Sequence, residues 1–195
     1  MIRGRKPLSL ASDIFFVGLV AMLLFPSTRN LLLSGVASVR TWITKTGVSA
    51  GPPVSLSPEG WNWRLTDALG RETTFGSFRG EVIFLNQWAT WCPPCRAEMP
   101  SIARLYRDYG DRIKFVMLTG EDPRKVRDFI DKQGYTFPVY FGSVAGASLS
   151  SRSIPSTAII SRSGEIMANM KGAYNWNARK IRKLIERLES EKLAE

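Results

Sequence analysis

Apolar and polar positions divide the chain into an apolar N-terminal segment and a longer region with strand and helix periodicity. Trp61, Trp63 and Leu65 alternate with polar residues, which predicts a strand, and residues 73–75 are expected to pair back with it as a hairpin. Compact β-favouring runs predict further strands at residues 81–87, 112–118, 137–141, 156–161 and 165–170. Helical spacing of apolar residues predicts helices at 92–109, 123–132 and 177–193.

The order of these elements defines a fold class. It is two strands, then β-α-β-α-β, then two strands and a closing helix, and no internal repeat is visible. Such an order is typical of a parallel βαβ core with a terminal hairpin. We therefore expect an α/β fold in three layers, with a central mixed sheet, helices on both of its faces and an N-terminal β-hairpin.

The N-terminal segment resembles a membrane anchor. Its apolar run at residues 14–25 gives about 18 Å of helix, which is short of a bilayer core, but counting from Leu8 brings the length near the requirement. A cleaved signal peptide fits the basic start and short apolar run, and a buried helix of a soluble domain is a third reading. We favour a single-pass anchor at residues 1–30, an amphipathic segment and linker at 31–60, and a folded domain at 61–195.

Composition removes several functional classes. The chain has no histidine and two cysteines, so a Ser-His-Asp triad, a Cys-His dyad and a histidine-ligated metal are excluded, and structural zinc is not expected. The formal net charge is +10, yet no run of basic residues interleaved with stacking aromatics indicates nucleic-acid binding. We expect no metal and no nucleic-acid partner.

The segment WCPPC at residues 91–95 carries the candidate chemistry, because it lies between a predicted buried strand and a predicted helix. Cys92 would stand at the helix N-terminus, where the dipole and unpaired amides stabilise a thiolate. Cys95 lies one turn on and can resolve a mixed disulfide formed by Cys92. Pro93 and Pro94 suit the first helical positions because their missing amide protons would be unpaired there. The alternative of two inert core thiols or a static bridge fits this placement poorly.

Residues 86–100 (NQWATWCPPCRAEMP) resemble the active-site signature of thioredoxin-like proteins of the TlpA/ResA branch, and the resemblance extends over about residues 61–193. It implies a thioredoxin-like fold, with Cys92 as the exposed attacking thiol and Cys95 as the buried resolving thiol. It also implies that Ile154-Pro155 is a cis-proline loop facing the cysteines, whose backbone binds substrate as an added strand. Pro100 matches a proline that kinks the active-site helix.

Three further side chains near the cysteines raise questions of role. Thioredoxins proper carry a buried Asp six positions before the first cysteine, where this chain has Asn86, which cannot titrate. Glu98 matches a glutamate of the TlpA/ResA branch, and it would accept the proton of Cys95 or tune the thiol pKa values; alternatively it is an exposed helix residue. Trp91 is expected to form an apolar docking surface over the disulfide. Trp88 is expected to pack in the core, and Thr90 to be a loop residue.

Together these features predict a thiol-disulfide oxidoreductase without a separate cofactor, since the redox group is the Cys92–Cys95 pair. The resemblance implies an extracytoplasmic reductase, held in the cytoplasmic membrane by one helix, with its catalytic domain on the periplasmic side. Its partners would be a membrane-embedded electron donor and client proteins with cysteine pairs, such as apocytochrome c or copper-site proteins. The alternatives are a disulfide-donating oxidase or isomerase of the same fold and a chaperone-like binding module without turnover.

Overall fold

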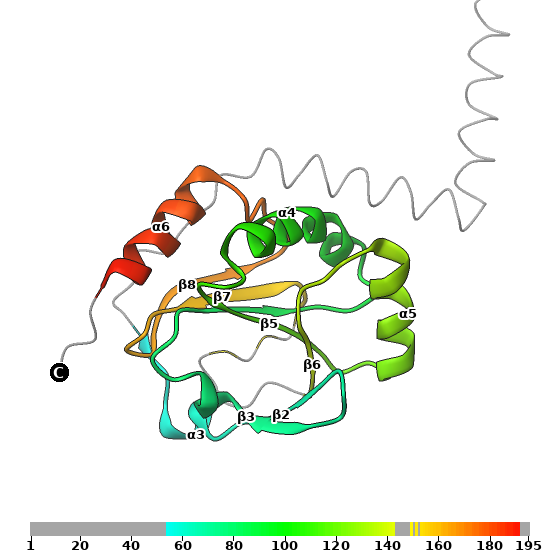
Figure 1. Ribbon diagram of the computed structural model, residues 1–195, viewed down its shortest axis with the longest axis horizontal. Helices are drawn as coiled ribbons and strands as arrows, with labels where there is room; N and C mark the ends of the chain where they lie inside the picture. The colour runs from blue at the N-terminus through cyan, green and yellow to red at the C-terminus, as the bar shows by residue number, and fades with distance from the viewer. Residues whose placement is uncertain (1–53, 143–148, 150, 152, 192–195) are drawn as a thin grey trace, which may run out of the picture.

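The computed structural model describes residues 54–142, 149, 151 and 153–191 of the chain (Figure 1). In these ranges, the strands form one eight-stranded sheet in the order β1-β8-β7-β4-β5-β6-β2-β3. The strands are β1 (Val54–Ser55), β2 (Arg64–Asp67), β3 (Glu72–Thr74), β4 (Ile83–Gln87), β5 (Lys114–Thr119), β6 (Val139–Phe141), β7 (Ser156–Ile160) and β8 (Glu165–Lys171). The helices are α3 (Pro58–Trp61), η1 (Phe75–Phe78), α4 (Pro93–Tyr109), α5 (Pro123–Gln133) and α6 (Arg179–Ser190).

The sheet is mixed, as predicted. Strands β4, β5 and β6 run parallel, and α4 and α5 make the crossovers between them. Strand β7 pairs antiparallel with β4 on its other side, and β8 pairs antiparallel with β7. The predicted N-terminal hairpin is also present, because β2 and β3 pair antiparallel. Its β2 strand then continues the sheet by pairing with β6.

Alternating residues of the central strands divide the core into two clusters, one on each face of the sheet. Phe84 belongs to the cluster that includes the buried side chains of α4, α5 and α6. Its neighbours Ile83 and Leu85 belong to the cluster covered by α3, η1 and the β2–β3 hairpin. Figure 1 shows α4 and α6 above the sheet and α3 below it. Helices therefore flank both faces, but in the described ranges the three long ones share one face.

The helix ends follow local chemistry. The side chain of Asp122 accepts hydrogen bonds from the backbone amides of Arg124 and Lys125, so it caps α5 as expected. At the other end of α5, Gly134 takes a left-handed conformation with φ of 67°, which glycine adopts without steric cost. The stripe of α6 predicted to be buried is buried, and it consists of Ile181, Leu184, Ile185 and Leu188.

The predicted strand through Trp61, Trp63 and Leu65 is wrong at its start. Trp61 ends the short helix α3, which Ser57 caps by accepting a hydrogen bond from the amide of Gly60, and the strand begins only at Arg64. Part of the predicted linker also belongs to the folded region, because β1 pairs with β8. The first change follows from local sequence, because the Ser57-Pro58 pair is a helix-start signal and Trp61 of that helix packs against Phe75.

The predicted anchor at residues 1–30 and the adjoining segment 31–53 lie outside the described residues. Over residues 54–142 and 153–191, none of the helices combines the length and the apolar content needed to cross a membrane.

Candidate active site

The two cysteines lie where the loop after β4 enters α4. Cys92 is the N-cap residue of α4, and its Sγ accepts a hydrogen bond of 3.2 Å from the backbone amide of Cys95. Pro93 and Pro94 occupy the first helical positions, and Cys92 and Cys95 form a disulfide. This amide and the helix dipole both favour negative charge on the Cys92 sulfur when the bond is reduced.

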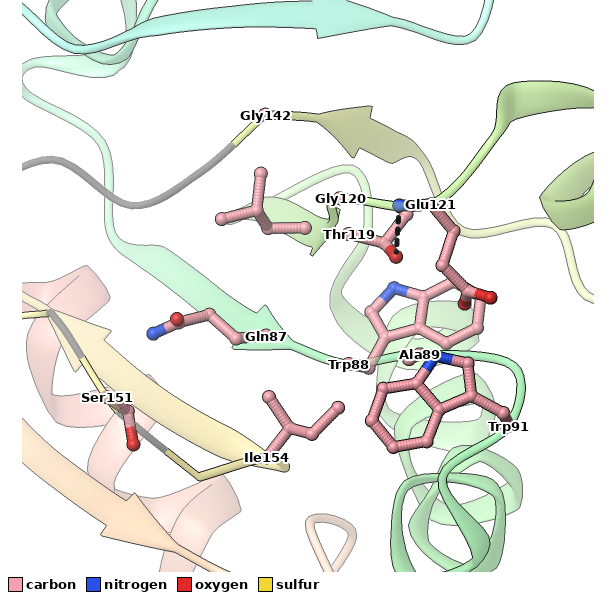
Figure 2. Close-up of a pocket in the computed structure, with 11 residues that line it drawn as sticks. Gln87, Trp88, Ala89, Trp91, Thr119, Gly120, Glu121, Gly142, Ser151 and Ile154 are labelled. Carbon is pink, nitrogen blue, oxygen red and sulfur yellow. Dashed lines mark hydrogen bonds between the residues drawn. The ribbon is translucent and has the colours of Figure 1, made fainter.

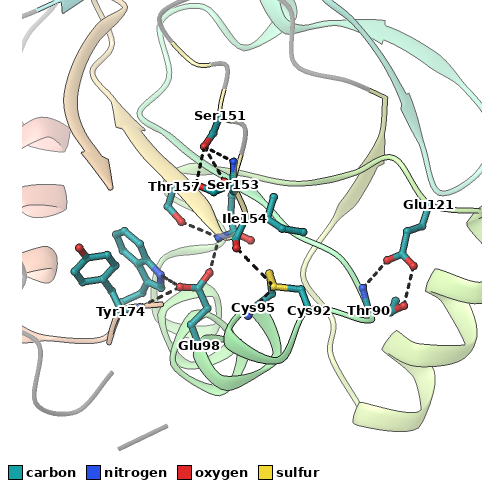
Figure 3. The surroundings of a disulfide bond; sticks show 12 residues. Thr90, Cys92, Cys95, Glu98, Glu121, Ser151, Ser153, Ile154, Thr157 and Tyr174 are labelled. Carbon is teal, nitrogen blue, oxygen red and sulfur yellow. Dashed lines mark hydrogen bonds between the residues drawn. A yellow bond between two sulfur atoms is a disulfide. The ribbon is translucent and has the colours of Figure 1, made fainter. Parts of the chain in front are cut away.

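The loop before β7 closes over the disulfide. The Ile154-Pro155 peptide bond is cis, as the resemblance implied, and the Ile154 carbonyl oxygen lies 3.8 Å from Cys92 Sγ (Figure 3). Cys95 is fully buried, and Cys92 is only 3% exposed. The expectation of an exposed Cys92 is therefore wrong for the disulfide form, because the N-cap position and the Ile154 loop enclose its sulfur.

The exposed feature next to the disulfide is Trp91, whose side chain is 65% exposed. It borders a hollow of about 490 Å³ between the ends of β4, β5 and the Ile154 loop (Figure 2). Trp88 contributes to the wall of this hollow but is 2% exposed and packs against Phe129, which confirms that it is a core residue. A large apolar side chain beside a hollow is a feature of protein recognition sites.

Glu98 is the buried carboxyl of the site, not an exposed helix residue. It lies one turn after Cys95 on α4 and is 1% exposed. Its Oε2 accepts hydrogen bonds from Trp176 Nε1 at 2.9 Å and from the Tyr174 amide at 3.1 Å. Its Oε1 accepts one from Asn86 Nδ2 at 2.7 Å. Burial raises the pKa of Glu98 to about 8 against these hydrogen bonds, which favour the charged form.

Asn86 joins this carboxyl to the sheet. Besides Glu98, its Nδ2 donates to Thr157 Oγ1 on β7 at 2.7 Å. Asn86 lies on β4 and is fully buried, so the hydrogen bonds connect β4, β7, α4 and the segment after β8 around one carboxyl. Figure 3 shows Glu98 on the same helix as Cys92 and Cys95, with Tyr174 and Thr157 on the side of its carboxyl group.

A second carboxylate, Glu121, supports the loop that leads into Cys92. Its Oε1 accepts from the Thr90 hydroxyl at 2.9 Å, its Oε2 accepts from the Thr90 amide, and Lys125 pairs with Oε1 at 2.6 Å. Partial burial raises the pKa of Glu121, but the hydrogen bonds from Lys125 and Thr90 outweigh it and hold the pKa below its ordinary value. Thr90 therefore fixes the active-site loop, a role that the sequence reading did not assign.

The structure thus gathers Trp91, Cys92, Cys95, Glu98 and the Ile154-Pro155 loop around one disulfide, with Pro93 and Pro94 at the helix start. Glu121, Trp176 and Thr157 were missed. A signal for Glu121 existed: it follows β5, and the carboxyl ends of adjacent parallel strands place their loops side by side. Across the described residues, no group of three His, Cys, Asp or Glu side chains has the arrangement of a metal site.

A mixed sheet with a CxxC disulfide at the N-terminus of a helix, facing a cis-proline loop, defines a thioredoxin-like thiol-disulfide oxidoreductase. A family model described as Redoxin matches residues 45–185. The chain therefore belongs to the Redoxin family, and its redox group is the Cys92–Cys95 pair.

Relatives of known class agree with this assignment. The thiol-disulfide oxidoreductase ResA of Geobacillus kaustophilus is 35% identical over 134 residues, which are 66% of this chain and 72% of the relative. ResA of Halalkalibacterium halodurans is 31% identical over 54% of this chain, and the match spans 62% of that relative's length. The thioredoxin-like protein YneN of Bacillus subtilis is 32% identical over 54% of this chain and 65% of the relative.

Solved structures match the fold. A thiol:disulfide interchange protein of the thioredoxin family from Chlorobium tepidum aligns with a TM-score of 0.59 and 21% identity, over 73% of this chain and all of that one. A putative thioredoxin from Neisseria meningitidis aligns with a TM-score of 0.57 and 22% identity, over 76% of this chain and 95% of that one. At these identities the likeness concerns the fold alone.

Proposed function

We propose that this chain is an extracytoplasmic reductase that passes two electrons from a membrane-embedded donor to the disulfides of client proteins. The observation that carries the proposal is the Cys92–Cys95 disulfide at the start of α4, beside the Ile154 carbonyl and the exposed Trp91. A partner that presents a cysteine there meets an exposed aromatic ring and a loop backbone next to the enclosed Cys92 sulfur. Trp91, Pro93, Pro94, Ile154 and Pro155 form the client-binding surface in this proposal.

The exchange proceeds in two steps. The Cys92 thiolate attacks one sulfur of the client disulfide, so that a mixed disulfide forms and one client thiolate leaves. The Cys95 thiolate then attacks the Cys92 sulfur, which restores the Cys92–Cys95 bond and releases the second client thiolate. Two electrons thus move from the dithiol to the client, and the donor reduces the pair again.

Glu98 is the proton acceptor for Cys95 in this scheme. Cys95 is fully buried, so solvent has no direct access to its thiol proton. Glu98 lies one helical turn away and, with a pKa of about 8, it changes charge in the range where a thiol does. A carboxyl with an ordinary pKa would be a far weaker base toward a thiol.

The N-terminal segment and the relatives support a proposal for localisation and partners. We propose that residues 1–30 anchor the chain in the cytoplasmic membrane and that the folded domain faces the periplasmic side. The resemblance to the TlpA/ResA branch supports clients with cysteine pairs, among them apocytochrome c with its haem-attachment cysteines and copper-site proteins.

Trapping of the mixed disulfide tests the proposal. The full chain with Cys95→Ser should form a long-lived covalent complex with a peptide that carries an oxidised Cys-x-x-Cys-His segment, because the chain no longer has the thiol that resolves the mixed disulfide. The matched variant Cys92→Ser should form none. Non-reducing electrophoresis and mass spectrometry measure both. Equal client handling by Cys92→Ser and the unchanged chain would instead indicate a binding module without turnover.

A further inference from the structure

The hydrogen bonds around Glu98 fit only one of its two charge states. All three partners, the Asn86 side-chain amide, the Tyr174 backbone amide and the Trp176 indole, donate to the carboxylate. A protonated carboxyl carries an O–H group of its own, which needs an acceptor. Leaving that group unpaired in the interior is unfavourable.

Asn86 is the one partner that can turn into an acceptor. Backbone and indole N–H groups only donate, whereas a carboxamide has a donor side and an acceptor side of nearly the same shape. At present Asn86 Nδ2 donates to both Glu98 and Thr157, while its Oδ1 is buried without a hydrogen-bond partner among the described residues. The terminal torsion of asparagine is broad and roughly two-fold, so a half-turn exchanges the two sides.

We propose that the Asn86 carboxamide turns by half a revolution when Glu98 takes up a proton, so that Asn86 Oδ1 accepts the Glu98 O–H and the Thr157 hydroxyl. Asn86 is then the positioning residue of the proton site. The inference rests on the proposed function, since Glu98 receives its proton from Cys95 there. Nothing but a proton and two hydrogen-bond directions changes.

The two orientations of the Asn86 carboxamide have the same number of hydrogen bonds. Each gives Asn86 two hydrogen bonds, because the Thr157 hydroxyl can accept from Nδ2 or donate to Oδ1, and each leaves one polar group of Asn86 without a partner. The charge on Glu98 therefore selects between them. Its hydrogen-bond partners do not override this choice: they are the Asn86 side-chain amide, the backbone amide of residue 174 and an indole N–H, none of which carries a charge. On α4, Cys92 and Cys95 form a disulfide, which does not titrate.

Glu98→Gln imitates the protonated state. The Tyr174 and Trp176 donors should hold the oxygen of the substituted carboxamide in the place of Oε2, which leaves its nitrogen toward Asn86. Two amide nitrogens cannot face each other with a hydrogen bond, so Asn86 should present Oδ1 at every pH.

Side-chain amide NMR of the oxidised full chain tests the turn. Asn86 Nδ2 protons should show a nuclear Overhauser contact with Thr157 at pH 9 that is lost by pH 6, and Glu98→Gln should lack it throughout. The exposed Asn62 amide serves as the internal reference. An Asn86–Thr157 contact that persists at pH 6 and in Glu98→Gln would overturn the proposal.

Trp176→Phe tests whether the Asn86 turn is coupled to the protonation of Glu98. It removes one donor that favours the Glu98 carboxylate and leaves Asn86 untouched, so the pH midpoint of the Asn86 turn should rise. An unchanged midpoint would contradict the link. Disulfide-exchange rates separate this inference from the proposed function. Full activity of Glu98→Gln, with the Asn86 turn still seen in the unchanged chain, would refute the proton role of Glu98 but not the turn.

Discussion

Glu98 is a buried carboxyl whose pKa is set by its surroundings. Its carboxyl is 1% exposed, and no cation is among its hydrogen-bond partners in the described part of the chain, so desolvation outweighs three hydrogen bonds and raises its pKa. The burial that would suit it to accept a thiol proton in the proposed mechanism also makes its ionised form costly in the folded state. The proposal therefore links stability and function through one group.

This link gives a pH-dependent stability. The Glu98 pKa is about 8 in the folded chain against an ordinary 4.5, so its contribution is fully favourable below pH 4.5 and is lost as pH rises through 8. The total loss amounts to roughly 5 kcal/mol at most. In urea unfolding of the oxidised chain, Glu98→Gln should show a much flatter dependence between pH 4.5 and 8. Parallel curves for the two proteins would contradict the assignment.

The chemistry of the cysteines could be predicted from adjacent residues, whereas the setting of Glu98 could not. WCPPC carries its own helix-start signal, so the helix N-terminal cysteine followed from local sequence. Trp176 contacts Glu98 from 78 residues away along the chain, and Thr157 contacts Asn86 from 71 residues away. No local pattern encodes such contacts, because they depend on how β7 and the segment after β8 return to α4.

At the scale of elements, the site is built where β4 ends and α4 begins, and two loops from elsewhere complete it. The Ile154 loop precedes β7, which pairs with β4, and Glu121 follows β5, which pairs with β4 on the other side. The strand order therefore brings both loops to the disulfide. Compact β-favouring runs predicted the central strands well because both faces of these strands are buried.

The elements before β2 were less predictable. Trp61, Trp63 and Leu65 are all buried, so their alternation is real, but Trp61 reaches the core from α3 and not from a strand. Large apolar residues at three alternate positions predict a single strand, although the Ser57-Pro58 pair before them is a helix-start signal. Burial alone does not distinguish the two arrangements.

Phe75→Ala tests whether α3 and η1 are integral to the domain. Phe75 is fully buried between Trp61, Trp63 and Phe78, so its truncation should lower the free energy of unfolding by about 3–5 kcal/mol. The exposed Leu69→Ala in the β2–β3 turn is the matched control and should change it little. Chemical denaturation measures both. Equally small effects of the two substitutions would mean that α3 and η1 contribute little to the stability of the domain.

At the scale of the whole molecule, the proposed anchor and the folded domain divide the work. In the proposed function, the anchor would keep the disulfide near a membrane-embedded donor, and the domain would present it to clients. The full chain should remain with membranes after carbonate extraction, whereas a chain lacking residues 1–30 should be released. Cys92→Ser should behave as the unchanged chain does, because membrane attachment does not depend on the redox pair. Release of the full chain would argue for a cleaved or peripheral segment.

The direction of electron flow is the central claim, and the reduction potential of Cys92–Cys95 tests it most directly. The purified full chain would be equilibrated with defined dithiothreitol or glutathione buffers, and the fraction of dithiol measured by thiol alkylation. The account predicts a potential near or below that of thioredoxin, about −270 mV, which makes the dithiol a strong donor. A value near about −120 mV, as in strong disulfide donors, would contradict it and make the chain an oxidase.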